Sequence, residues 1–499
     1  LTLLLKNFAS RYRYGSDLTR HALHQALVEI MVEMPVYRTY LTPRRQADEG
    51  RNHLRKALRR AQRNNPGMGN ELEFLARILP LEINRDLSEE ERQAWRHFVM
   101  RFQQLTGPLM AKGIEDTLLY VYNRLICLNE VGGSPEHFGV KPEDFHAFNQ
   151  KRARLWPHTM NASATHDTKR GEDTRTRIAV LSELPQEWER HLRSWYRLNA
   201  PLKKRVRRRM VPDKNDEYFL YQTLLGSWPL HPQDMGDYPQ RIRDYAIKAV
   251  REAKVHTGWL KPDSAYEDAY LEFVDALFQE QHSFIEEFAP FQEKIAFFGM
   301  LNGLSQLLLK ATSPGIPDFY QGCEFWDLSL VDPDNRRPVD YTARRKSLAA
   351  LQKSANRDIT GLLAELRNDW QSGRIKMYLT WRCLQAREEQ PDLFSDGDYL
   401  PLEVEGKYAE HLLAYARRLE SKAVVMVVPR LMTGLVETGI WPVGEDVWGD
   451  TCIVLPEEMQ GSWHDLLSGR SIETEDHLDI GTLLQDLPLA LLSRSPAKD

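Results

Sequence analysis

The chain has 499 residues, 42% of them hydrophobic and 27% charged, and its formal net charge is −5 at pH 7. Such a length predicts about two to four domains, or one barrel with additions. The slightly acidic balance argues against nucleic acid or anionic lipid as a partner, and no apolar run approaches the ~20 residues that a membrane span needs.

The four cysteines (Cys127, Cys323, Cys383 and Cys452) lie far apart and form no CxxC pair. Their spacing argues against a redox motif, a zinc ribbon and a disulfide framework, and it fits a reducing cytoplasm. The opening "LTLLL" is too short for the apolar part of a signal peptide and lacks a basic segment. Because the chain starts with Leu1 instead of Met, we expect the true beginning of the protein upstream.

The first part of the chain has helical patterns. Asp17 is placed to cap a helix over "DLTRHALHQALVEIMVE". Ser88 and Glu91 have the spacing of a capping box before a segment whose apolar residues recur at helical intervals. We expect a further helix over residues 115–130 that stops at the Gly132–Gly133 pair.

The middle of the chain alternates between helices and short strand candidates. The stretch "LWPHTMNASAT" leads into the charged cluster "HDTKR", and Pro185 opens the next helix. Residues 200–283 indicate a long helical excursion, and an apolar helix ending at Gly315 leads into the strand candidate "IPDFYQG". This order is typical of an α/β fold with a parallel sheet or a barrel.

From about residue 396 the pattern changes to short strands separated by turn residues, which predicts a closing antiparallel β-sandwich. We expect three regions. Residues 1–156 form a helical insertion region, residues 157–375 hold the barrel strands and helices with the excursion, and residues 396–499 form the sandwich.

His166 and Asp167 follow a strand-like stretch. In a β/α barrel the carboxyl ends of the strands face the active site, so an acid placed there can take part in chemistry. The alternative is structural, because Asp167 or Thr168 can cap the next helix and Glu172 and Asp173 can stabilise its first turn. The same two interpretations, helix-start acids or substrate contacts, apply to Glu115 and Asp116.

Two other charged segments favour structural roles. The basic run "LKKRVRRRM", residues 202–210, lacks the interleaved aromatics of a nucleic-acid site and indicates a solvated, salt-bridged face. In residues 324–341, Asp332-Pro333-Asp334-Asn335 predicts a turn, and Arg336 and Arg337 are placed to fix the loop by binding carboxylates. No P-loop, GxGxxG, GxSxG or HExxH motif is present, which excludes the matching nucleotide-binding and hydrolase classes at the level of motifs.

Several segments, taken in order, resemble the maltooligosyl trehalose synthases, a branch of the α-amylase superfamily (glycoside hydrolase family 13). The matching segments are "MAKGIEDT", "LNEVGGSPEHFG", "ATHDTKRGEDTRTRIAVLSE", "NDEYFLYQTLLGSWP", "PGIPDFYQGCEFWDLSLVDPDNRRPVDY" and "VVPRL". "HD" alone is shared by all amylase-like enzymes. "THDTKR" together with "SLVDPDNRRPVDY" is specific to this branch.

The resemblance implies an α/β fold: the last part of a (β/α)8 barrel with large helical insertions, followed by a β-sandwich. It also implies a reaction in which the reducing-end α-1,4 linkage of a maltooligosaccharide becomes α,α-1,1. The family needs no redox cofactor and no catalytic metal. It points to a maltooligosaccharide as the substrate and to a trehalose-releasing hydrolase as a functional partner, with neither nucleic acid nor membrane as a partner.

By the motif match, Asp167 is the carboxylate that stabilises the transition state and His166 donates to a sugar hydroxyl beside it. Retaining glycoside chemistry also needs a nucleophile and a proton donor ~5–5.5 Å apart. We expect Lys169 and Arg170 to hydrogen-bond the reducing-end glucose and retain it while it turns over, because that retention separates a mutase from a hydrolase.

Glu115, Asp116 and Tyr320, which lie in matching segments, are further substrate-binding candidates under the resemblance. The chain also departs from the family pattern, since the motifs that carry the nucleophile and the acid should precede Asp167 and neither is found there. We therefore expect this chain to be the C-terminal portion of the enzyme, with one catalytic carboxylate of three, and to be inactive alone. The alternatives are an α-glucan hydrolase of the same superfamily and a non-catalytic glucan-binding fragment.

Overall fold

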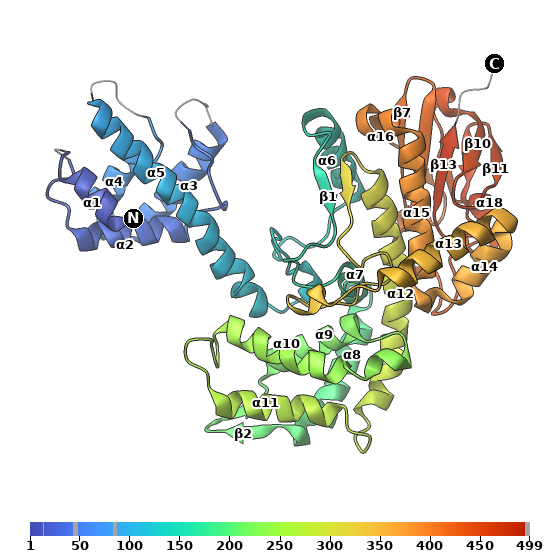
Figure 1. Cartoon of the computed structure of the whole chain (residues 1–499), viewed down its shortest axis with the longest axis horizontal. Coiled ribbons are helices and arrows are strands. Elements are labelled where there is room, and N and C mark those ends of the chain that lie inside the picture. Colours follow the sequence, from blue (N-terminus) through green and yellow to red (C-terminus); the bar gives the residue numbers. More distant parts are fainter. Residues whose placement is uncertain (13, 43–47, 83–86, 495–499) are drawn as a thin grey trace. The chain divides into compact units, whose positions relative to one another are not determined.

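The computed structural model describes residues 1–494 except 13, 43–47 and 83–86. The contacts within the chain divide it into two compact units, Leu1–Tyr120 and Val121–Asp499 (Figure 1). Among the described residues, no helix is both long and apolar enough to cross a membrane.

The first unit is helical. Its helices are α1 (Thr2–Ala9), α2 (Arg20–Val32), α3 (Asp48–Asn64), α4 (Gly69–Ile78) and α5 (Glu89–Met110). They enclose an apolar core that includes Leu23, Leu75 and Phe98. The predicted capping box at α5 is confirmed: Ser88 Oγ accepts from the Glu91 N–H at 3.2 Å, and the Glu91 carboxylate accepts from the Ser88 N–H at 2.9 Å.

Two local predictions in this part of the chain are wrong. Thr19, not Asp17, caps α2, because the Thr19 hydroxyl accepts from the Ala22 N–H at 3.1 Å. The helix expected over residues 115–130 does not form; a π-helical turn (Ala111–Glu115) ends α5, and short 3-10 turns follow.

The reason lies in contacts made by a distant side chain. The amide of Gln222 accepts from the Ile126 N–H at 2.9 Å and donates to the Asn123 carbonyl at 2.9 Å. These bonds use backbone groups that a helix would need for its own ladder. A tertiary partner that no local pattern reveals therefore sets the conformation of this segment.

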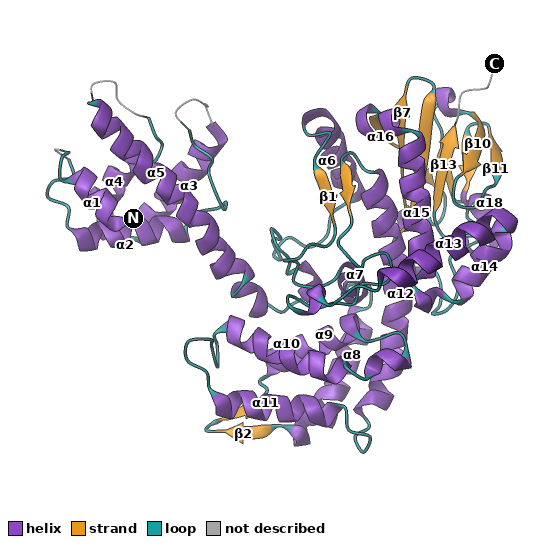
Figure 2. Ribbon diagram, viewed as in Figure 1, coloured by secondary structure: helices purple, strands orange, loops and turns teal. Residues whose placement is uncertain are grey.

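In the described part of the second unit, one short parallel pair of strands forms, β1 (Met160–Ala162) and β4 (Ile316–Asp318), at the two predicted strand positions. Their register pairs Ala162 with Asp318, so both strands run in the same direction and end at the same level. The neighbouring helices are α6 (Pro142–Leu155), α7 (Glu172–Val180) and the long α12 (Phe284–Thr312). Figure 2 shows the pair between loops and helices.

Helix α8 (Pro185–Asn199) precedes residues 200–283, where a helical excursion is expected. Residues 200–283 are mainly helical and contain one small hairpin; their elements are β2 (Lys204–Val206), β3 (Arg209–Val211), α9 (Lys214–Ser227), α10 (Tyr238–Ala253) and α11 (Ser264–Leu277). Pro185 opens α8 as expected. The basic run is mostly exposed and forms ion pairs, such as Arg207 to Asp263 at 2.9 Å, which confirms a solvated, salt-bridged face.

Helices α13 (Tyr341–Arg357), α14 (Ile359–Asn368), α15 (Arg374–Glu389) and α16 (Pro391–Asp396) lead into a strand-rich end. Its strands are β5 (Asp398–Pro401), β6 (Val404–Glu405), β7 (Leu412–Leu419), β8 (Lys422–Pro429), β9 (Cys452–Val454), β10 (Gly461–Asp465), β11 (Ser471–Thr474), β12 (His477–Asp479) and β13 (Ala490–Arg494). Two short helices, α17 (Glu445–Trp448) and α18 (Ile480–Leu483), lie between them in sequence.

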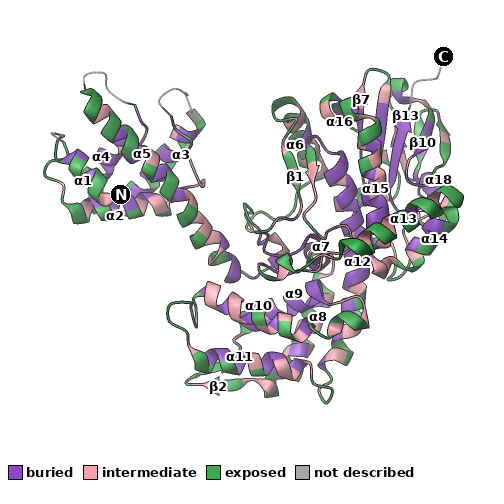
Figure 3. Cartoon of the chain, viewed as in Figure 1, coloured by how far each residue is buried: buried purple, intermediate pink, exposed green. Residues whose placement is uncertain are grey.

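These strands form two antiparallel sheets, ordered β11-β10-β13-β8-β7-β5 and β12-β9-β6. One apolar core contains residues of both, among them Val425 of β8 and Ile453 of β9. Strands β7 and β13 of the larger sheet are largely buried (Figure 3). The predicted change to an antiparallel pattern near residue 396 is therefore confirmed.

Candidate active site

The candidate site is built on the ends of β1 and β4. Because parallel neighbours end at the same edge of a sheet, the segments that follow them start side by side. One segment carries His166 and Asp167, and the other carries the half-buried Tyr320. The structure thus brings the starts of these two sequence-predicted segments to one end of the strand pair.

His166 and Asp167 occupy an exposed turn between Thr165 and Thr168. The Thr168 hydroxyl donates to the Thr165 carbonyl at 2.9 Å, and the Asp167 N–H donates to the Thr165 hydroxyl at 3.2 Å. The side chain of Asn335 closes the turn from outside by donating to the His166 carbonyl at 3.1 Å. Hydrogen bonds thus hold the backbone of the turn, while His166 and Asp167 are exposed.

The helix-cap interpretation of Asp167 and Thr168 is wrong. Helix α7 begins only at Glu172 and its capping position is Gly171, which offers no side-chain cap. Asp167 therefore has no structural role in starting that helix. Its exposed carboxylate at a strand end is the arrangement expected of a group that binds a ligand.

Lys169 is 3% exposed, and its backbone N–H donates to the Glu130 carboxylate at 2.7 Å. Glu130 belongs to the segment "LNEVGGSPEHFG" that contributed to the family resemblance. Through this contact, one of the two segments holds the backbone of the other just after the exposed turn.

Arg170 is 1% exposed, and its guanidinium is surrounded by protein groups. It donates to the Ile126 carbonyl and to the Tyr245 hydroxyl, each at 3.1 Å, and lies 5.3 Å from the centre of the Phe219 ring. A group enclosed in this way holds the loop in place. The geometry favours such a positioning role over the sugar contact expected from the sequence.

Beneath the turn, the first two residues of α7 form a buried ionic cluster. Lys376 Nζ lies 2.6 Å from Glu172 Oε1 and 2.5 Å from Asp173 Oδ2, and Lys310 Nζ lies 3.3 Å from Glu172 Oε2. The Ser163 hydroxyl donates to the Glu172 carboxylate as well. The acids therefore do more than stabilise a helix start.

Burial and charge act against each other in this cluster. Burial alone would raise the pKa of Glu172, but the ammonium groups of Lys376 and Lys310 lower it to about 2. Burial raises the pKa of Asp173 to about 6, because the attraction of Lys376 offsets burial only in part and the charge of Glu172 repels. Burial lowers the pKa of Lys376, yet the two carboxylates outweigh that effect and raise it.

Sequence reasoning missed Lys376 and Asn335. Lys376 stands between Ile375 and Met377, which are both buried. A lysine enclosed by apolar neighbours is a signal for a paired internal charge. Asn335 was predicted only as a turn residue, and nothing local connects it to His166.

Glu115 and Asp116 lie in the first unit, at the end of α5 and not in the first turn of a helix as expected. Glu115 is 5% exposed and accepts from the Tyr37 hydroxyl. Asp116 forms an ion pair with Lys112 at 2.6 Å. Both carboxylates are thus engaged within their own unit.

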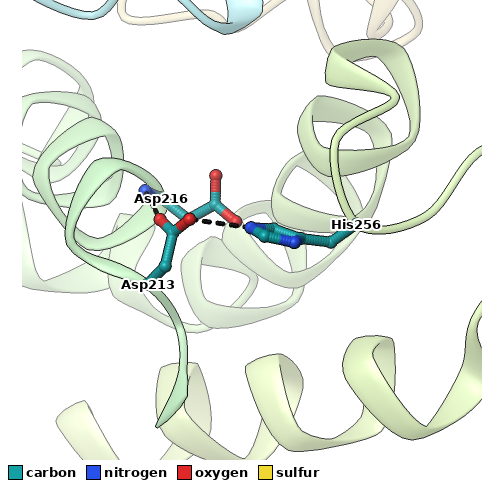
Figure 4. Close-up of side chains that lie close together, drawn as sticks. All are labelled: Asp213, Asp216 and His256. Atoms are coloured by element: carbon teal, nitrogen blue, oxygen red, sulfur yellow. Dashed lines mark hydrogen bonds and ion pairs between the residues drawn. The ribbon is translucent and has the colours of Figure 1, made fainter. Parts of the chain in front are cut away.

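Among the residues that the structure describes, the ligand atoms of Asp213, Asp216 and His256 lie within 4.8 Å of one another (Figure 4). Arg209 lies 3.1 Å from Nδ1 of His256, and a guanidinium can only donate. Nε2 therefore carries the proton that Asp213 accepts at 2.7 Å, while Tyr266 donates to Asp216. Hydrogen bonds within the protein already use the nitrogen that a metal ion would need.

No family model matches the chain. A curated relative, named a maltooligosyl trehalose synthase, from Mycobacterium tuberculosis (strain CDC 1551 / Oshkosh) is 36% identical over 398 residues. The match covers 80% of this chain and 46% of the relative. A protein of the same name from M. tuberculosis strain H37Rv gives the same values.

Solved structures give the same result. Maltooligosyltrehalose synthase from Arthrobacter ramosus superposes with a TM-score of 0.77 at 33% identity, over 98% of this chain and 56% of that protein. The Sulfolobus tokodaii structure described as a maltooligosyl trehalose synthase gives a TM-score of 0.66 at 28% identity, over 99% of this chain and 58% of its own. The chain spans about half the length of the relatives that it matches.

Proposed function

We propose that this chain, a homologue of the maltooligosyl trehalose synthases over about half of their length, supplies one part of a transglycosylating active site. The complete site would convert the reducing-end α-1,4 linkage of a maltooligosaccharide into an α,α-1,1 linkage. The single observation that supports this most directly is the exposed His166–Asp167 turn at the end of β1, in a chain with this similarity.

The proposed reaction exchanges one glycosidic bond for another. A nucleophilic carboxylate attacks the anomeric carbon of the sugar next to the reducing end, and an acid protonates the leaving O4 of the terminal glucose. That glucose then turns and attacks the glycosyl-enzyme through its own anomeric hydroxyl, giving up its proton to the former acid. No water is consumed, so the number of sugar units stays the same.

Asp167 binds the 2- and 3-hydroxyls of the sugar whose ring flattens, and His166 donates to a neighbouring hydroxyl. Hydrogen bonds to these hydroxyls strengthen as the ring distorts, so they lower the barrier more than they tighten substrate binding. The exposure of both side chains in a turn with a fixed backbone supports this assignment. Tyr320, from the segment after β4, adds an aromatic contact to the sugar.

Lys169 and Arg170 have separate roles in this proposal. Lys169 hydrogen-bonds the reducing-end glucose and retains it during its turn, whereas Arg170 fixes the loop through Tyr245 and Ile126. Glu115 and Asp116 remain candidate substrate contacts at the end of α5.

The nucleophile and the acid come from a part of the protein not contained in this chain. Two observations support the need for more strands. The β1–β4 pair is a two-stranded parallel sheet, which is not stable in isolation. Apolar side chains of the pair itself are also exposed, Met160 of β1 at 65% and Ile316 of β4 at 49%.

We propose that β1 and β4 are adjacent strands of a (β/α)8 barrel completed by that other part, with residues 1–156 as a helical insertion region and 157–375 as the last barrel strands and helices. Residues 396–499 then form the C-terminal β-sandwich. The product would be the substrate of a trehalose-releasing hydrolase. The four free cysteines agree with the cytoplasm as the proposed location.

The proposal is tested with the complete protein and maltopentaose. A mutase removes reducing ends while the mass of the sugar stays constant. A hydrolase instead creates reducing ends and releases glucose or maltose. Binding without turnover by the complete protein would indicate a glucan-binding protein and would overturn the proposal.

A further inference from the structure

Lys376 is a buried lysine on α15, far in sequence from both strand ends. Its side chain is 1% exposed. Nζ has three acceptors: Glu172 Oε1 at 2.6 Å, Asp173 Oδ2 at 2.5 Å and the Phe325 carbonyl at 3.2 Å. An ammonium group has three N–H donors, so each one has a partner.

These acceptors belong to the two segments that follow β1 and β4. Glu172 and Asp173 begin α7, directly after the His166–Asp167 turn, and Phe325 lies in the loop after β4. The Lys376 ammonium group therefore links the two segments by hydrogen bonds.

Two hydrogen bonds donated by backbone N–H groups also connect these segments. The Asp327 N–H donates to Asp173 Oδ2 at 2.7 Å, and the Gly171 N–H donates to the Ser329 carbonyl at 2.8 Å. The same loop after β4 reaches Asn335, which donates to the His166 carbonyl. A displacement of Lys376 would thus move the His166–Asp167 turn both through the start of α7 and through the loop after β4.

The charges of the cluster balance: two carboxylates face the ammonium groups of Lys376 and Lys310. A buried ion pair contributes little net stability compared with apolar residues of similar volume, so stability alone does not explain it. Three directed hydrogen bonds from Lys376 fix the geometry between the two loops, which apolar packing would not do.

We propose that Lys376 is a positioning residue that sets where the His166–Asp167 turn stands relative to the segment after β4. This inference rests on the proposed function for its kinetic readout, because Asp167 must lie correctly against the sugar. A misplacement of about 1 Å far from the chemistry can cost about 100-fold in rate.

The central variant is Lys376→Met in the complete protein, which keeps an unbranched side chain as far as Cε and removes Nζ with all three donors. We expect kcat on maltopentaose to fall about 100-fold while KM changes less than threefold, because Asp167 acts mainly on the transition state. Arg417→Met is the matched control. Arg417 is also 1% exposed, but it binds the carbonyls of Phe394, Gly397 and Thr312, none of which lies in either loop.

A second variant separates positioning from stability. Asp173→Asn/Lys376→Met removes one acid and one base, and it leaves Glu172 paired with Lys310. We expect its thermal midpoint to recover toward the wild-type value while kcat stays low, because the three bonds of Lys376 are still missing. Recovery of kcat together with the midpoint would overturn the proposal.

Hydrogen exchange on the same proteins does not depend on activity. In both Lys376 variants, the amides of Gly171 and Asp327 should exchange at least tenfold faster, whereas peptides of β7 and β8 should not change. Unchanged exchange at these two amides would overturn the proposal even if the reaction proves to be different. Wild-type protein without mutase activity would contradict the proposed function instead, and the exchange result would still decide the role of Lys376.

Discussion

Ala162 and Asp318 are paired in register across two parallel strands, although the whole helical excursion separates them in sequence. This pairing places the segment with His166 and Asp167 beside the segment with Tyr320. It converts two distant motifs into one candidate site, and the functional proposal depends on it. The predictions below concern the complete protein unless the chain alone is named.

The first prediction concerns Asp167. Asp167→Asn should lower kcat about 100- to 1,000-fold, because it removes a charged acceptor that binds the sugar most strongly in the transition state. The thermal midpoint should not change, since the side chain is exposed. Initial rates with maltopentaose and a thermal scan check both statements. Asp268→Asn, at an exposed acid of α11 beyond its first turn, is the control and should leave both quantities unchanged.

The second prediction separates the two basic residues that follow. Lys169→Ala should increase the ratio of released glucose to non-reducing product, because the terminal sugar is retained less well. Chromatography of the products measures this ratio. If glucose release stays at the wild-type level, Lys169 does not hold the leaving sugar.

The third prediction concerns the stability of the chain. Arg170→Ala should lower the free energy of unfolding by about 2–4 kcal/mol, since it leaves a cavity and deprives the Ile126 carbonyl and the Tyr245 hydroxyl of a donor. Urea unfolding measures it. Arg208→Ala, at an exposed position of the hairpin turn, should change stability by less than about 0.5 kcal/mol. Equal effects of the two variants would refute the buried role of Arg170.

The fourth prediction follows from the raised pKa of Asp173, about 6 against an ordinary value of 3.8 for aspartate. The folded state binds the Asp173 proton more tightly than the unfolded state does. The contribution of this proton to the free energy of unfolding is therefore complete below about pH 4 and is lost as the pH rises through 6. The unfolding free energy of the wild type, minus that of the Asp173→Asn variant, should therefore decrease as the pH rises over this range. Urea unfolding at four pH values between 4 and 7 measures it, and a difference that rises with pH would contradict the direction of the shift.

The fifth prediction concerns the strand pair in the chain alone. Met160→Lys/Ile316→Lys should slow aggregation, measured by light scattering, because lysines on strand edges oppose pairing with other chains. Leu260→Lys, at a fully exposed apolar residue away from the strands, is the control. If both variants slow aggregation equally, the β1–β4 pair is not the surface through which the chains aggregate.

Local chemistry predicted much of the fold. The capping box at Ser88 and Glu91 and the proline that opens α8 were readable from the sequence, because each depends on residues close in the chain. The change to antiparallel strands near residue 396 was readable for the same reason. The segment after Glu115 was not, because its backbone groups pair with Gln222, which lies far along the chain.

The exposed residues of the candidate site could be predicted from the sequence, whereas the buried residues that position them could not. The motif identified His166 and Asp167, but the enclosure of Arg170 by Phe219 and Tyr245 depends on packing that only three dimensions show. The role of Lys376 is likewise visible only in three dimensions, where its side chain reaches from α15 to the first two residues of α7. Residues that touch a ligand belong to short motifs, whereas residues that position them come from anywhere in the chain.

The most direct test of the account follows a single carbon atom. Maltopentaose labelled with 13C at C1 of its reducing-end glucose is incubated with the complete protein and observed by NMR. The account predicts that the two reducing-end anomeric signals are replaced by one signal of an α,α-1,1 acetal, with no loss of chain length. Appearance of the label in free glucose as the main product would contradict it.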